Sequence, residues 1–131
     1  MHPFRAAVEA KAITDVPELL APEIVFNSPV VHKPYHGRET VAGLLYAVFH
    51  VFEDFRYVNE YASADGRDHA LLFSARVGDR ELEGCDFIHD DDNGLIDEFT
   101  VMVRPLSAAH ALRDAMVLKL TQLQDAATPS L

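Results

Sequence analysis

The sequence predicts one α+β domain in which helices pack on the concave face of a strongly curved, mostly antiparallel β-sheet. In the first half of the chain, apolar residues recur at helical spacing, most clearly from Val41 to Val48. In the second half, residues 55–104 alternate in polarity between turn signals, as strands do. A long sheet that is covered on one face must twist, so we expect its concave side to enclose a cavity.

The first half predicts three helices and one strand. Apolar residues at helical spacing in residues 4–13 indicate a first helix, and Asp15 provides an N-cap for a short second one. Residues 23–28 fit a strand that Pro29 closes. A loop over residues 30–37 leads to the third helix, whose apolar stripe comprises Val41, Leu44, Leu45, Val48, Phe52 and Phe55.

The second half predicts an antiparallel meander and a last helix. Asn93-Gly94 is a strong hairpin signal, because both residues accept the positive φ that a tight turn requires. Ser107 can cap the last helix. We expect residues 1–124 to form the single domain and residues 125–131 to be a disordered tail. The four strands of the meander are expected over residues 55–62, 69–77, 80–90 and 95–104.

Composition argues against several classes of function. The 131 residues suit one domain and carry a net charge of −10, which repels nucleic-acid phosphates and anionic membranes. Cys85 is the only cysteine, so neither an internal disulfide nor a multi-cysteine metal site can form. The first residues lack a signal-peptide pattern, and no apolar run approaches the length of a membrane span. We therefore expect a cytoplasmic protein that binds neither nucleic acid nor membrane.

Three segments carry a resemblance to a known family: LLAPEIVF at residues 19–26, the Ser-Pro to Gly-Arg stretch at 28–38, and FTVMVRP at 99–105. Over residues 4–116 the chain resembles the nuclear-transport-factor-2-like (NTF2-like) superfamily and its SnoaL-like domains. This superfamily includes ketosteroid isomerases, limonene-epoxide-hydrolase-like enzymes, polyketide cyclases and non-enzymes. The resemblance implies a cone-shaped fold with a hydrophobic pocket. The convex sheet face, left partly bare, is expected to form a homodimer.

Carried over to this sequence, the isomerase pattern is incomplete. Asp86 matches the aspartate that stays protonated and donates to the developing oxyanion. The general-base aspartate of the pattern falls on Ser28, and its tyrosine falls near Ala7. Because these two groups supply large parts of the rate, ordinary ketosteroid isomerisation is not expected.

The epoxide-hydrolase pattern also matches in part. Its water-positioning asparagine resembles Asn27, and its arginine on the third strand resembles Arg76. Its second aspartate falls at about Val101. One carboxylate of the relay is therefore missing.

If the family register holds, Asp86 is the one ionisable residue in an apolar concave row of the strand at 80–90, between Gly84 and Ile88. Arg76 is placed on the concave face of the preceding strand with Leu72 and Ser74, where it could pair with Asp86 and lower its pKa. Without that pair, burial would raise the pKa. A structural ion pair, or a register that exposes Asp86, is the alternative interpretation.

His32, Tyr35 and His36 lie in the loop expected at the mouth of the cone, where a histidine can shuttle a proton. Solvated loop histidines are the commoner situation. A metal site at His32 and His36 is not expected, because Pro34 between them breaks the helical geometry that this spacing needs. The acidic run at residues 90–94 lacks the terminal acids of a calcium loop and fits a hairpin turn.

The sequence thus predicts a protein that binds a hydrophobic small molecule without a cofactor or metal. One hypothesis is an isomerase, cyclase or epoxide hydrolase that transfers protons on a polycyclic or terpenoid-like substrate. The other is a non-catalytic dimeric ligand carrier or protein-interaction module of the same fold. The candidate catalytic residues are Asp86, Arg76, His32 and Asn27, and the candidate ligand-binding residues are Tyr35, His36, Phe52, Ser74, Phe99, Val101 and Val103.

Overall fold

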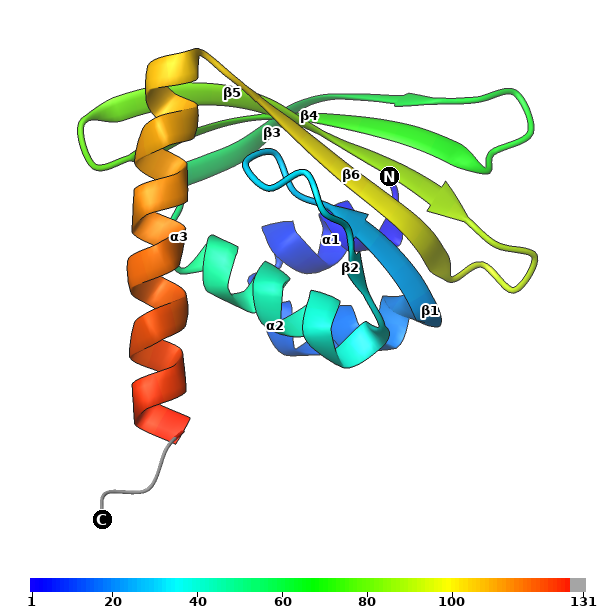
Figure 1. Ribbon diagram of the computed structural model, residues 1–131. Coiled ribbons are helices and arrows are strands. Elements are labelled where there is room, and N and C mark those ends of the chain that lie inside the picture. The colour runs from blue at the N-terminus through cyan, green and yellow to red at the C-terminus, as the bar shows by residue number, and fades with distance from the viewer. Residues whose placement is uncertain (128–131) are drawn as a thin grey trace.

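In the computed structural model, which describes residues 1–127, six strands form one curved, unclosed sheet in the order β2-β1-β6-β5-β4-β3 (Figure 1). All neighbouring strands are antiparallel except β1 and β6, which run parallel. The predicted α+β class and mostly antiparallel sheet are therefore confirmed. The strands are β1 (Leu20–Asn27), β2 (Tyr35–His36), β3 (Glu53–Ala62), β4 (Asp68–Val77), β5 (Arg80–Asp90) and β6 (Ile96–Arg104).

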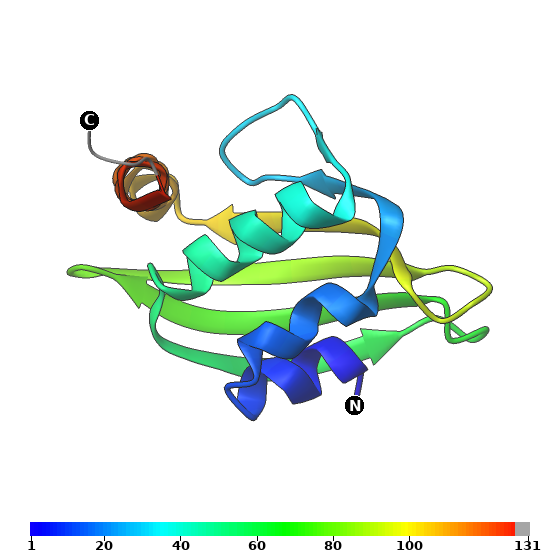
Figure 2. The same ribbon diagram turned by 90° about the horizontal axis from the view of Figure 1, so that it is seen from below.

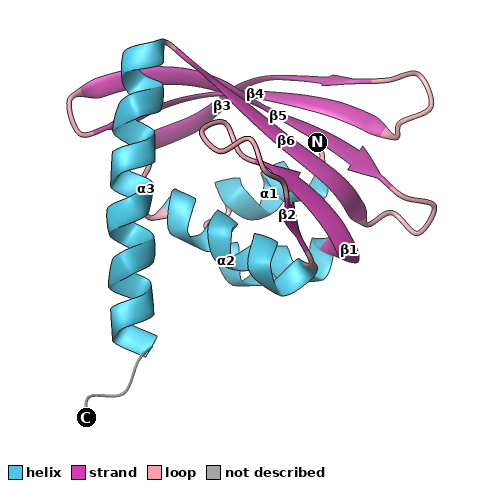
Figure 3. Ribbon diagram, in the orientation of Figure 1, coloured by secondary structure: helices cyan, strands magenta, loops and turns pink. Residues whose placement is uncertain are grey.

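Helices cover one face of this sheet, as Figure 2 shows from below. α1 (Pro3–Glu9), the 3₁₀ helix η1 (Ile13–Leu19) and α2 (Arg38–Phe49) lie under the concave face. α3 (Leu106–Ala127) stands beside the sheet at the end where β6 stops, and its later turns extend beyond the sheet layer (Figure 3). Among the described residues, no helix has the length and apolar character to cross a membrane.

The first helix ends at Glu9, short of the predicted residue 13. Ser107 lies inside α3, which begins at Leu106, so it does not cap that helix.

Two further helix predictions need correction. The predicted apolar stripe extends beyond the helix that it was assigned to. α2 ends at Phe49, whereas Phe52 lies in the following turn and Phe55 lies in β3. Both rings still pack against the core, so the helical spacing of these two residues was coincidental. Asp15 caps no α-helix; it lies inside η1, whose first residue has no side-chain cap.

The last helix reaches into the segment predicted to be a tail. α3 continues to Ala127, into the segment predicted to be disordered. Residues 128–131 lie outside the described part of the chain, so the prediction for them is untested.

Gly84 is the position at which the backbone of β5 lies closest to the ring of Phe73 in the aromatic core. It pairs directly with Phe73 of β4, and a Cβ built on Gly84 would lie 2.3 Å from Phe73 Cζ. Phe73 is 2% exposed and is in contact with further rings, so it has little room to move. Glycine is therefore required here for space, since its φ is not in the left-handed region.

We predict that Gly84→Ala lowers the free energy of unfolding by about 1–3 kcal/mol, because the added methyl overpacks the core. Gly43→Ala is the matched control: Gly43 lies within α2, with nothing within 4 Å of the added Cβ. That change should raise the free energy of unfolding by roughly 0.5–1 kcal/mol through helix propensity. Urea denaturation checks both values. Equal effects of the two substitutions would contradict the proposed contact.

Candidate functional site

A cavity of about 150 Å³ lies between the concave sheet face, α2, α3 and the β1–β2 loop. Its wall is mostly apolar. Asp86 and Arg113 are the charged residues that line it, and Arg113 is about half exposed on α3. Much of the wall is aromatic: Phe26, Phe49, Phe52, Phe55 and Phe99.

Asp86 faces this cavity from the middle of β5 and is 4% exposed. Its direct partners across the sheet are Leu71 of β4 and Val101 of β6, so its surroundings on both sides are apolar. Burial raises the pKa of the Asp86 carboxyl to about 7, against a smaller lowering by a hydrogen bond from Tyr57. The predicted inward orientation of Asp86 is what the structure shows.

Tyr57 is a site residue that the sequence analysis did not single out. Its hydroxyl donates to Asp86 Oδ2 over 3.0 Å, and this is the one hydrogen bond to that carboxylate within the described residues. Burial and the neighbouring carboxylate raise the pKa of Tyr57, so the phenol stays protonated and remains a donor. The signal was present in the alternation of β3, which places Tyr57 on the same face as Phe55.

The predicted orientation of β4 was wrong by one residue. Val77 pairs directly with Arg80 across a two-residue turn, so odd-numbered residues of β4 stand opposite even-numbered residues of β5. Directly paired residues point to the same face. The concave face therefore takes Leu71, Phe73 and Ala75, while the expected residues Leu72, Ser74 and Arg76 point to the convex side.

Arg76 consequently cannot pair with Asp86. Its guanidinium instead contacts Glu53 at 3.0 Å and Asp54 at 3.1 Å on the outer side of the β3–β4 pair. Ser74 lies near it in an open depression of the surface that is lined by both polar and apolar residues, away from the cavity that Asp86 faces. Neither side chain lines the cavity that Asp86 faces.

Asn27 is also turned away from the cavity. Its amide donates to Thr100 Oγ1 over 2.9 Å, and the two residues pair directly between β1 and β6. Because Phe99 and Val101 on either side of Thr100 line the cavity, strand alternation places Thr100 and Asn27 on the opposite face. The expected water-positioning role of Asn27 is therefore not supported by its place in the fold.

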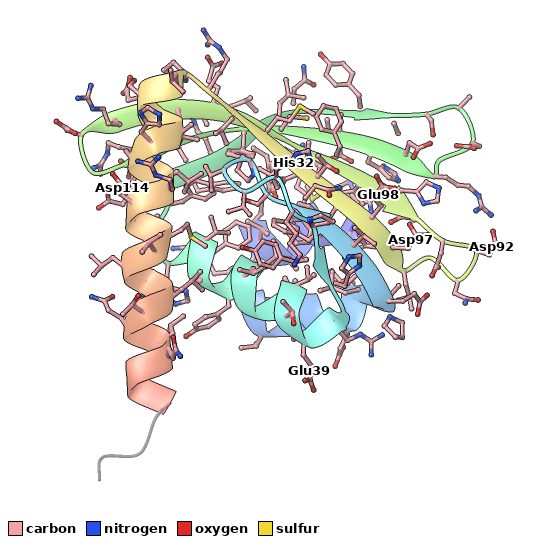
Figure 4. All side chains as sticks on the ribbon, in the orientation of Figure 1. His32, Glu39, Asp92, Asp97, Glu98 and Asp114 are labelled. Atoms are coloured by element: carbon pink, nitrogen blue, oxygen red, sulfur yellow. The ribbon has the colours of Figure 1, made fainter. Side chains whose placement is uncertain are left out.

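The loop between β1 and β2 contributes to the cavity through other residues than the histidines. His32 and His36 are exposed and are absent from the cavity wall; Figure 4 shows His32 on this loop. Tyr35, which with His36 forms β2 rather than part of the loop predicted over residues 30–37, lines the cavity together with Val30 and Val31 of the loop. Of the remaining candidate ligand-binding residues, Phe52, Phe99 and Val101 line it, while Val103 packs against the core outside the wall.

His2, His69 and Asp90 form a polar cluster near the N-terminus. One histidine nitrogen or carboxylate oxygen from each residue lies within 4.8 Å of the other two, as in a potential metal site. His2 Nε2 lies 3.0 Å from Asp90, and His69 Nε2 lies 3.1 Å from the same carboxylate. His2 Nδ1 accepts a hydrogen bond from the Phe4 amide, so in the neutral ring Nε2 carries the proton. A metal-ligating histidine instead donates through its other nitrogen, so this arrangement fits a hydrogen-bonded tether of the N-terminus better than a metal centre.

Comparison with known proteins places this fold. The family model for the SnoaL-like domain matches residues 2–99, and the chain therefore belongs to the SnoaL-like family with its NTF2-like fold. The chain is similar to the crystal structure of a steroid delta-isomerase from Pseudomonas aeruginosa, with 46% identity, a TM-score of 0.90, and 93% of this chain and 89% of that chain covered.

A protein conserved in bacteria with a cystatin-like fold, from Silicibacter pomeroyi DSS-3, is 35% identical, with a TM-score of 0.85 and coverage of 92% and 87%. A polyketide cyclase homologue from Pseudomonas putida KT2440 shares the fold at 16% identity, with a TM-score of 0.66 and coverage of 80% and 88%. Among curated proteins, no match was found.

We predict that Asp86→Asn stabilises the protein increasingly between pH 4 and pH 7. The pKa of about 7 in the folded protein exceeds the ordinary aspartate value of 3.8, so the unfolded chain loses this proton at lower pH than the folded one. Wild-type stability therefore falls as pH rises between these two values. The asparagine carries no such ionisation and can still accept the Tyr57 hydrogen bond. Its advantage should approach about 4 kcal/mol at pH 7 and above.

Urea denaturation at a series of pH values measures this difference. Asp79→Asn, in the exposed turn between β4 and β5, is the control and should follow the wild-type curve. A difference between Asp86→Asn and wild type that stays constant from pH 4 to pH 7 would show that the carboxyl titrates normally.

Proposed function

We propose that this protein moves a proton within a hydrophobic small molecule, with Asp86 as the group that takes the proton and returns it. The observation that carries the proposal is one buried carboxyl in an apolar cavity, held through a single oxygen by Tyr57. A base works best when its pKa lies near the working pH, and burial raises the pKa of Asp86 to about 7.

The proposed reaction is the migration of a double bond next to a carbonyl. Ionised Asp86 removes a proton from the carbon between the carbonyl and the alkene, so a C–H bond breaks and a dienolate forms. The protonated carboxyl then delivers the same proton to the far carbon of the former alkene. A new C–H bond forms, the double bond becomes conjugated with the carbonyl, and Asp86 returns to its ionised state.

Tyr57 positions the base in this proposal. Its hydroxyl holds Oδ2 of Asp86, and its ring packs edge-on against Phe55 at a centroid distance of 4.9 Å. The guanidinium carbon of Arg5 lies 5.7 Å from the centroid of the Tyr57 ring. A side chain fixed by several contacts keeps the carboxylate in one orientation toward the cavity.

An isomerase fits this site better than an epoxide hydrolase. The hydrolase pattern required Arg76 and Asn27 beside the reacting atoms, and both lie on the convex side. The similar Pseudomonas aeruginosa structure, described as a steroid delta-isomerase, also supports isomerisation. The second candidate is a non-catalytic ligand carrier, which is favoured by the small number of ionisable groups in the cavity wall.

We predict that the wild-type protein converts small β,γ-unsaturated cyclic ketones to their conjugated isomers and that Asp86→Asn lowers kcat/KM by about 10²–10⁴-fold, the usual contribution of a general base. Ultraviolet absorbance of the conjugated product measures the rate. Asp79→Asn is the matched control and should keep wild-type activity.

The pH profile provides a second readout. Because the ionised form of Asp86 is the base, kcat/KM should rise with pH through about 7 and level off above it. A carrier would instead bind these ketones with no turnover in the wild type, and unchanged activity in Asp86→Asn would contradict the assignment of the base.

We further propose that the convex sheet face forms a homodimer. Large apolar side chains are exposed there on three strands, namely Val58 (56%), Phe87 (43%) and Met102 (59%). Apolar residues on a sheet face without covering helices are expected to be covered by another surface.

The double variant Phe87→Glu, Met102→Glu should shift the protein from dimer to monomer in sedimentation-velocity experiments, because two buried carboxylates per subunit oppose association. Leu118→Glu is the control: Leu118 is 60% exposed on α3, away from the convex face. A wild-type protein that sediments as a monomer at micromolar concentration would contradict the dimer.

A further inference from the structure

The volume of the cavity restricts the size of the molecule that can reach Asp86. At about 150 Å³, the cavity is comparable in volume to an apolar cavity engineered into another protein that holds one benzene molecule. A single six-membered ring with a short substituent fits such a space. A skeleton of four fused rings would need several times more room.

The aromatic wall resists enlargement because its rings pack on one another. Phe55 is in contact with Phe49, Phe52 and Phe73 at centroid distances of 5.4, 5.5 and 4.9 Å. On the opposite wall, Phe99 lies 5.6 Å from Phe26. Since moving one ring displaces its neighbours, the cost of opening the cavity for a larger ligand is spread over a close-packed cluster.

The polar chemistry of the cavity defines the buried end of the ligand. Asp86 offers one carboxyl oxygen that is not engaged by Tyr57, in a cavity wall that is mostly apolar. An anionic group placed there would face an ionisable carboxyl without a counter-charge. A neutral ketone fits this site because it brings no further charge into the cavity. The proton on the carbon next to its carbonyl is the one that a carboxylate base can remove.

The opening lies between α3 and the β1–β2 loop, where cavity-lining residues become exposed. Val31 on the loop is 40% exposed and Val117 on α3 is 62% exposed, and Arg113 lies on the same helix. A substituent on the ring can therefore extend outward between these two segments. The cavity therefore restricts the size of the buried ring more than the length of this substituent.

We infer that the substrate is a neutral monocyclic β,γ-unsaturated ketone, whose ring occupies the space between Phe52, Phe99 and Asp86 and whose substituent points to the opening. This inference rests on the proposed isomerase function and narrows its substrate class, in contrast to the polycyclic skeleton that the sequence analysis included.

The test compares two substrates of the same chemistry and different size: 3-cyclohexen-1-one carrying a 4-alkyl group, and a four-ring β,γ-unsaturated ketosteroid. Wild-type kcat/KM should be at least 10-fold higher for the monocyclic ketone. Phe52→Ala, which removes a partly buried wall residue, should reduce or reverse this ratio. Tyr46→Ala is the matched control, because Tyr46 is 43% exposed on α2 and is not part of the cavity wall. It should leave the ratio unchanged.

A wild-type enzyme that turns over the ketosteroid as well as the monocyclic ketone would overturn the size inference while supporting the isomerase. If neither substrate reacts, calorimetry measures the affinity of the protein for the two conjugated products. This measurement tests the size limit separately from the isomerase function. In that case the proposed isomerase fails, and tighter binding of the monocyclic product would still support the size inference, whereas equal or tighter binding of the steroid would overturn it.

Discussion

The two-residue turn at Gly78 and Asp79 sets the face to which every side chain of β4 and β5 points. It pairs Val77 with Arg80 and so brings Leu71 opposite Asp86 and Phe73 opposite Gly84. A shift of one residue would turn Phe73 out of the core and place Arg76 inside. The apolar cavity, the isolated carboxyl and the outward ion pairs of Arg76 all follow from this register.

Burial of Asp86 has a cost in stability and a consequence for chemistry. One hydrogen bond from Tyr57 only partly compensates the loss of water, so the carboxyl is harder to ionise than an exposed one. Because the same environment raises the pKa to about 7, the ionised form is a stronger base than an exposed aspartate. Both protonation states of Asp86 are populated near neutral pH. In the proposed function, this position gives up stability for reactivity in a scaffold that is otherwise well packed.

Much of the fold could be predicted from the sequence, because long strands with clear turns and the α2 stripe depend on local patterns. The inward orientation of Asp86 was expected from the register that the family resemblance implies, combined with alternation along its own strand. Arg76 and Asn27 were misplaced because their orientation depends on pairing between strands, which the pattern of a single strand does not contain. Tyr57 was overlooked because a tyrosine among phenylalanines resembles core until its hydroxyl is seen beside a carboxylate.

The N-terminus is joined to the body of the domain through residue 2 itself. The His2 amide donates to Glu60 over 2.9 Å, and its imidazole reaches Asp90 at the far end of the meander. A single residue ahead of α1 thus bonds two non-neighbouring strands of the sheet, β3 through Glu60 and β5 through Asp90, and so fixes the position of α1 against both.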